Sequence, residues 1–139
     1  MASASVMKKD TAVQKKPWIA IVWFLLWGLF QAYAVAAVIA GTWTRPEAFP
    51  EEAYYALMYP DMFFIPLYFA AAILLFRGHY LGKILGLLTG GAVIYIMIYL
   101  LALSGLKGAI NLSFDSAFLI ADSIAVWQLV KMESGKAGK

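Results

Sequence analysis

The sequence predicts an all-α integral membrane protein, a bundle of four transmembrane helices with both termini in the cytoplasm. Of its 139 residues, 63% are hydrophobic and only 14% are charged, and the mean hydropathy is +0.77. Soluble domains carry roughly a quarter charged residues, and so short a chain would leave much of its apolar surface in water. Four apolar stretches are each long enough to cross the ~30 Å core of a bilayer. Lipid is therefore the expected solvent for most of the chain.

The first span of the predicted four-helix domain (residues 18–130) occupies residues 18–40, after a disordered basic tail at residues 1–17. The stretch is uncharged and longer than the apolar core of a cleaved signal peptide, so we expect it to remain uncleaved as a transmembrane helix. Trp18 and Trp43 stand near its two ends, where indole rings favour the membrane interface.

The second span is predicted at residues 53–76. A proline followed by two acids at Pro50 is typical of a helix start, so the helix is expected to begin there, with its first turns at the membrane interface. Pro60 or Pro66 is expected to kink this helix.

Two more spans follow a tight turn at residues 77–80. The third span is predicted at residues 81–103 and ends in a short loop at residues 104–108. The fourth span is predicted at residues 111–130, and the polar residues 131–139 form a second tail.

The distribution of lysine and arginine predicts the orientation, because cytoplasmic segments carry an excess of these residues. With the N-terminus inside, the outer segments hold only Arg45 and Lys107. The inner segments hold Lys8, Lys9, Lys15, Lys16, Arg77, Lys83, Lys131, Lys136 and Lys139. We therefore expect both tails in the cytoplasm and the chain in the cell membrane, which is the cytoplasmic membrane in a prokaryote.

Small residues follow one face of the third span. Gly78, Gly82, Gly86 and Gly90 are spaced four residues apart, a pattern that lets another helix approach closely. Packing within one bundle is the simpler interpretation of this face. The alternative is a homo-oligomer formed through it.

Three carboxylates are predicted inside the spans, where ionisable groups are costly and indicate function. Asp61 belongs to the second span, whereas Asp115 and Asp122 are seven residues apart on one face of the fourth. Each of the latter two is followed by a serine, Ser116 or Ser123. The structural alternatives are a helix-starting or interfacial role for Asp61 and Asp115, and a hydrogen-bonded acid that bridges two helices for Asp122.

Counting from the cytoplasmic charges at ~1.5 Å per residue places polar groups from all four spans in one outer layer. This layer contains Gln31, Tyr33, Asp61, Tyr99 and Asp115. A deeper set contains Trp27, Tyr68 and Asp122. If Asp61 and Asp115 meet, we expect them to share a proton or to hold a cation or an amine. Together with Asp122 they would form a stepped path for protons or cations. This path would be incomplete on the cytoplasmic side, because no acid, histidine or lysine lies between Asp122 and Lys131.

Aromatic residues in the same spans predict a different use of the acids. They could wall an apolar pocket in which a carboxylate orients an amine, a sterol or a polyene. The candidates are Trp23, Trp27, Tyr33, Phe63, Phe64, Tyr68, Tyr95, Tyr99, Phe114 and Phe118.

Several kinds of site are excluded by composition. The chain has no cysteine, which excludes disulfides, cysteine-based metal sites and a thiol nucleophile. Its one histidine cannot supply the two histidines of a zinc-binding helix. The charges stand at membrane boundaries rather than on one face, so no nucleic acid is expected as a partner. No cofactor and no metal site are predicted.

The segment Tyr59-Pro60-Asp61-Met62-Phe63-Phe64, with Ser113-Phe114-Asp115 at the start of the fourth span, resembles small four-helix membrane proteins of the YvaD-like type. The likeness covers about the last three spans through short motifs. It implies the four-helix architecture and singles out Asp61 and Asp115, but it implies no activity.

The leading functional prediction is an intramembrane carboxylate site that binds or transports a proton, a cation or a small amphipathic molecule. The predicted site residues are Gln31, Asp61, Tyr68, Tyr99, Asp115, Ser116, Asp122 and Ser123. One alternative is a membrane enzyme of the isomerase or cyclase type that acts on a lipid-like substrate, with Asp61 and Asp115 as general acid and base. Another is an accessory subunit of a larger membrane complex, docked through the glycine face. All three interpretations share the lipid bilayer as a partner.

Overall fold

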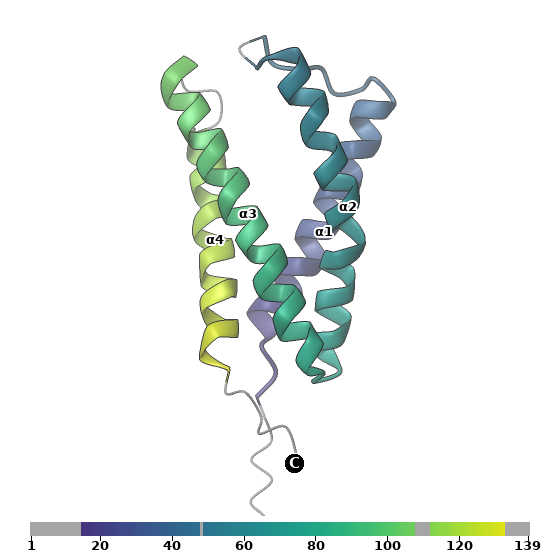
Figure 1. Ribbon diagram of the computed structural model, residues 1–139, viewed down its shortest axis with the longest axis vertical. Coiled ribbons are helices and arrows are strands. Elements are labelled where there is room, and N and C mark those ends of the chain that lie inside the picture. Colours follow the sequence, from purple (N-terminus) through teal and green to yellow (C-terminus); the bar gives the residue numbers. More distant parts are fainter. Residues whose placement is uncertain (1–14, 48, 108–111, 133–139) are drawn as a thin grey trace, which may run out of the picture.

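The computed structural model describes residues 15–47, 49–107 and 112–132, which form four helices (Figure 1). They are α1 (Trp18–Ile39), α2 (Glu51–Phe76), α3 (Tyr80–Lys107) and α4 (Leu112–Lys131). The predicted all-α class is confirmed, and each helix is long and apolar enough to span a membrane. Most of the two predicted tails, the end of the loop predicted at residues 104–108, and Asn111 lie outside the described residues.

The start of α2 agrees with the prediction, whereas the end of α3 differs from it. The helix α2 begins directly after Pro50 and continues without a break through Pro60 and Pro66, so a kink at either proline stays a prediction. The helix α3, however, continues through residues 104–107, where the sequence predicts a loop. Ser104 is buried among the helices, and this packing holds the last turn of α3 in helical form. The loop prediction was therefore wrong for these residues.

The turn between α2 and α3 depends on a glycine. Gly78 adopts a left-handed conformation with φ of 71°, which only glycine takes readily. The backbone N–H of His79 donates to Leu74 O at 2.8 Å, and that of Gly78 donates to Leu75 O at 3.0 Å. Together these bonds satisfy carbonyls that the helix end would otherwise leave free. A corresponding pair of bonds follows α1: the backbone N–H of Gly41, which also has a φ of 71°, donates to Val38 O at 3.1 Å, and that of Thr42 donates to Ala37 O at 2.9 Å.

The helices form a ring in which each packs against the next along the chain, and α1 meets α4 to close it. We call the end where residues 15–17 and Met132 lie the tail end, and the opposite end the distal end. The α1–α2 pair and the α3–α4 pair diverge toward the distal end, at the top of Figure 1. The bundle is therefore more tightly closed at its tail end.

The core combines alanines with large apolar side chains. Alanine in the contact allows helices to approach closely, and the large side chains of the facing helix fill the space. Its buried members are Ala20, Ile21, Phe24, Trp27, Tyr68, Ala71, Ala72, Leu75, Val93, Met97, Ala125 and Leu129. Large hydrophobic side chains are also exposed on every helix, among them Leu29, Phe63, Tyr95 and Ile120. Such a surface suits lipid rather than water.

Three of the four predicted packing glycines line one face of α3. A Cβ added at Gly82 would lie 2.5 Å from the backbone nitrogen of Leu75, and one at Gly86 would lie 2.5 Å from Leu129 Cδ1. A Cβ at Gly90 would collide with Val126 Cγ2. This face is thus covered by other helices of the same chain, and self-association through it stays a prediction.

Gly78 does not belong to this packing face. It precedes α3, and a Cβ added there would meet no atom within 4 Å. The four-residue spacing holds in the sequence, but the helical period applies only where the backbone is helical. The backbone conformation of the turn, rather than helix contact, accounts for this glycine.

Two hydrogen bonds between helices tie the tail end together. Gln128 Oε1 of α4 accepts from the backbone N–H of Ala20 at 2.9 Å, in the first turn of α1. Lys83 Nζ of α3 donates to the carbonyl of Met132, just beyond α4, at 2.6 Å. Both bonds satisfy backbone groups that helix ends leave without a partner. In apolar surroundings such a group costs the most free energy when it stays unpaired, because no water can bond to it.

Candidate functional site

A cavity of about 450 Å³ lies between the two helix pairs in the distal half of the bundle. It brings together three of the predicted site residues from three helices: Gln31 of α1, Asp61 of α2 and Asp115 of α4. Its other lining residues are Trp27, Phe30, Trp43, Leu57, Ile96, Met97, Leu100, Phe114 and Phe118. The predicted outer polar layer therefore converges on one space through these three residues.

The cavity continues toward the distal end through two adjoining spaces of about 320 and 210 Å³. Trp43 and Leu100 border all three spaces, Asp115 borders the first of the two extensions, and Asp61 borders the second. The two acids thus stand where the cavity adjoins these two smaller spaces.

Each acid is placed by its helix. Asp115 lies in the first turn of α4, where the partial positive charge of the helix start favours a carboxylate. Asp61 follows Pro60 inside α2, about three turns from the start of that helix. Both side chains are half-buried. The sequence left open whether Asp61 is embedded or interfacial, and the structure places it on the cavity lining.

Aromatic rings form the α1–α4 wall of the cavity. The ring centroid of Phe118 lies 4.3 Å from that of Phe114, 5.1 Å from that of Trp27 and 5.6 Å from that of Phe30. Edge-on and stacked aromatic pairs at such separations are favourable contacts. The wall presents ring faces and edges to the space that Asp61 and Asp115 border.

Trp43 closes the distal side of this wall. It follows the glycine turn at Gly41, and its ring lies 6.2 Å from that of Phe30. The loop is held by Arg45, whose guanidinium donates to the carbonyl of Phe49. The sequence predicts only an interfacial position for Trp43, because it does not indicate that the loop folds back over the helices.

Asp122 lies deeper than the cavity and does not line it. Its side chain has 0% exposure. The indole N–H of Trp23 donates to Asp122 Oδ1 at 2.7 Å, whereas Oδ2 has no hydrogen-bond partner within the described part of the chain. The acid therefore bridges α4 to α1 through one oxygen, as its structural alternative predicts.

The remaining predicted site residues do not join Asp61 and Asp115. Tyr68 is buried in the core, and Tyr99 is 38% exposed on the outer surface of α3. Ser116 is half-buried outside the cavity lining. Ser123 is exposed, and its hydroxyl donates to Leu119 O of its own helix at 2.7 Å.

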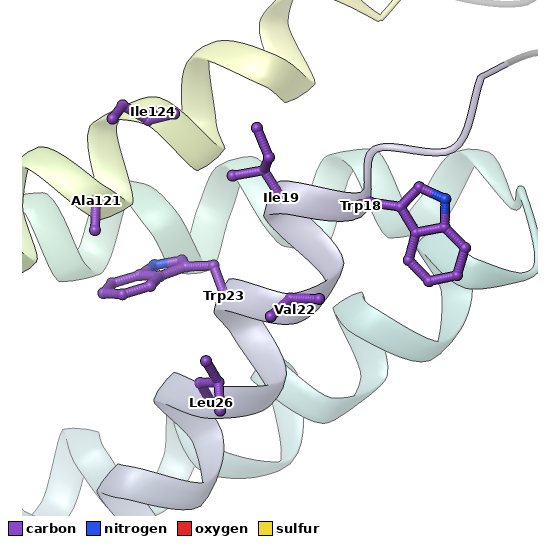
Figure 2. A pocket seen from close by; sticks show the side chains of 7 residues that line it. All are labelled: Trp18, Ile19, Val22, Trp23, Leu26, Ala121 and Ile124. Carbon is purple, nitrogen blue, oxygen red and sulfur yellow. The ribbon is translucent and has the colours of Figure 1, made fainter.

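An open apolar groove of about 500 Å³ runs between α1 and α4 toward the tail end (Figure 2). It is lined by Trp18, Ile19, Val22, Trp23, Leu26, Ala121 and Ile124. None of the predicted site residues borders it, and its side chains suit contact with lipid chains. Within the described residues, no group of three histidines, cysteines or acids could hold a metal ion.

No protein-family model matches the chain, and no curated protein or solved structure matches it significantly. The resemblance to YvaD-like proteins stays a prediction.

Proposed function

We propose that the chain is a multi-pass protein of the cell membrane, with both termini in the cytoplasm, whose cavity binds a small amphipathic cation such as an amine with an apolar body. The orientation is supported by the cations at the tail end, where Lys16, Arg77, Lys83 and Lys131 flank the helices. By the excess of positive charge inside, this end faces the cytoplasm and the cavity opens toward the outside.

The observation that carries this proposal is the meeting of Asp61 and Asp115 on one cavity. No lysine, arginine or histidine is among the described lining residues. An ionised carboxylate accepts hydrogen bonds and attracts positive charge, and both effects strengthen in surroundings of low dielectric constant. A cationic guest supplies the charge that the lining lacks.

The rest of the lining favours a guest with an apolar body. Aromatic faces such as those of Trp27 and Phe118 attract cations and also pack against hydrocarbon. A volume of about 450 Å³ falls within the range of ligand pockets, roughly 300 to 1,000 Å³. Gln31 adds one amide, which can orient a polar substituent.

Binding of tetraphenylphosphonium, an apolar cation of fixed charge, tests the proposal. The protein purified in mild detergent is titrated with this probe in a calorimeter, alongside the variants Asp61→Asn and Asp115→Asn. Removing one charged contact is expected to weaken binding at least about tenfold.

The variant Glu52→Gln serves as the control, because it removes an exposed acid of α2 that lies away from the cavity. Its affinity is expected to equal that of the unmodified protein. Equal affinity in both aspartate variants, or no binding by the unmodified protein, would contradict the proposed function.

A further inference from the structure

Two buried polar atoms lack a partner within the described residues, and both lie near the middle of the bundle. They are Oδ2 of Asp122 and the indole nitrogen of Trp27. Such groups are rare in folded proteins, because an unpaired buried donor or acceptor costs free energy. The phenol of Tyr68 approaches the Trp27 indole, but outside hydrogen-bond geometry. The packing of the helices alone does not explain why these two buried atoms are left without a hydrogen bond.

The surroundings of Asp122 contain no group that pairs with a negative charge. On α1 its neighbour is Trp23, which is bonded to Oδ1, and on α3 it is Gly90, whose added Cβ would lie 3.7 Å from Oδ2. On α2, the phenol of Tyr68 is a titratable group within electrostatic range of Asp122. Asp115 lies two turns earlier on α4. No described lysine, arginine or histidine bonds to it, so Oδ2 is the oxygen available to carry a proton.

A stack of rings connects this acid to the cavity. Trp27 lines the cavity, and its ring stacks on that of Trp23 at 5.7 Å between centroids. Trp23 in turn donates to Asp122, and Phe118 packs against both indoles. Figure 2 shows the Trp23 ring extending from α1 toward α4 beside Ala121. A guest that shifts Trp27 therefore acts directly on the group that holds the carboxylate.

We propose that Asp122 binds the proton that this protein exchanges for a cation in the cavity. When the cation enters, the O–H bond at Oδ2 breaks, the electron pair stays on the oxygen, and the proton is released to the solvent. One positive charge enters as one leaves, so the net charge of the bundle is unchanged. By linkage, a proton on Asp122 weakens cation binding by the factor by which the cation weakens proton binding. The exchange rests on the proposed function of the cavity.

The test counts protons released when the cation binds. Tetraphenylphosphonium carries no exchangeable proton, so any proton released comes from the protein. Calorimetric titrations in two buffers of different ionisation enthalpy give the number released per bound cation. We expect release from the unmodified protein and a clearly smaller number from Asp122→Asn, which keeps an acceptor for Trp23 but cannot lose a proton. The affinity of the unmodified protein should rise with pH, by at most about tenfold per pH unit for one exchanged proton.

Ser123→Ala is the matched control, because Ser123 is the exposed neighbour of Asp122 and bonds only within α4. It should release as many protons as the unmodified protein. Infrared difference spectra add a second readout: on cation binding, the C=O stretch of a protonated carboxyl should disappear in the unmodified protein and in Ser123→Ala, and this change should be absent in Asp122→Asn.

The outcomes separate the two proposals. No binding by the unmodified protein would overturn the proposed function and the exchange with it. Binding with the same proton release in Asp122→Asn would overturn the exchange alone, and would assign the proton to Asp61 or Asp115. If Asp122→Asn does not fold, Asp122→Leu replaces it, because leucine leaves no unpaired amide in the core.

Discussion

The first turn of α1 is completed by a side chain from the far end of the sequence. Pro17 precedes this helix and offers no side-chain cap. Gln128 of α4 accepts from the backbone N–H of Ala20 instead. The sequence shows Gln128 only as a polar residue near the end of its span. This capping role of Gln128 could not be predicted, because Ala20 lies 108 residues away in the sequence. Their contact follows only from how α1 packs against α4, a contact that we call the seam.

Replacing Gln128 with leucine is therefore expected to destabilise the protein by about 1 kcal/mol, the typical worth of one hydrogen bond or helix cap. The measurement is the midpoint of thermal unfolding in detergent, followed by tryptophan fluorescence. Ser123→Ala is the comparison, because the Ser123 hydroxyl bonds only to its own helix. Equal midpoints for the two variants would show that the bond to Ala20 contributes nothing.

Among the helices, the glycine pattern of the third span was a productive signal with one error. It identified Gly82, Gly86 and Gly90 as contact positions, because small residues four apart recur on one helix face. It also included Gly78, which belongs to the turn between α2 and α3. Periodicity alone does not show where the helix starts. The end of α3 was mispredicted for a related reason: a serine followed by a glycine is typical of a loop, and the sequence does not show that Ser104 is buried.

Two neighbouring glycines of α3 provide a matched test of this packing. Gly90→Ala is expected to cost about 1–3 kcal/mol, because its Cβ would collide with Val126 and overpacking forces neighbours to move. Gly91→Ala adds the same methyl group where no atom lies within 4 Å, so it should be neutral or slightly stabilising. Unfolding midpoints of the two variants in one detergent decide the matter. If Gly90→Ala is as stable as Gly91→Ala, the close contact of α3 with α4 is wrong.

At the level of the whole molecule, counting residues along each span predicted how far polar groups lie along the bundle axis, but not whether they point into the bundle or out of it. Gln31, Asp61 and Asp115 reach the same cavity, as their shared level suggested. Tyr99 stands at that level too, yet it points outward. The rise per residue fixes height, whereas direction depends on how each helix is rotated toward its neighbours. The divergence of the helix pairs, which creates the cavity, leaves no trace in any single span.

The orientation of the bundle can be tested with single cysteines, because the chain contains none of its own. Glu47→Cys lies in the α1–α2 loop at the distal end, and His79→Cys lies in the α2–α3 turn at the tail end; both positions are exposed. In intact cells, a membrane-impermeant maleimide should label only Glu47→Cys. Labelling of His79→Cys should require permeabilisation, and the reverse pattern would overturn the proposed topology.

The ring of helices also predicts an order in which the chain assembles. Helices that follow one another in the sequence are in contact, so most of the bundle forms by closing short connections, which is fast. The seam between α1 and α4 joins the two helices that are most distant in the sequence, through the bonds from Ala20 to Gln128 and from Trp23 to Asp122. We therefore expect closure of this seam to be the last step of folding. The same step would bring Trp23 against Asp122 and complete the burial of the acid, so we expect the end of folding and the burial of Asp122 to coincide.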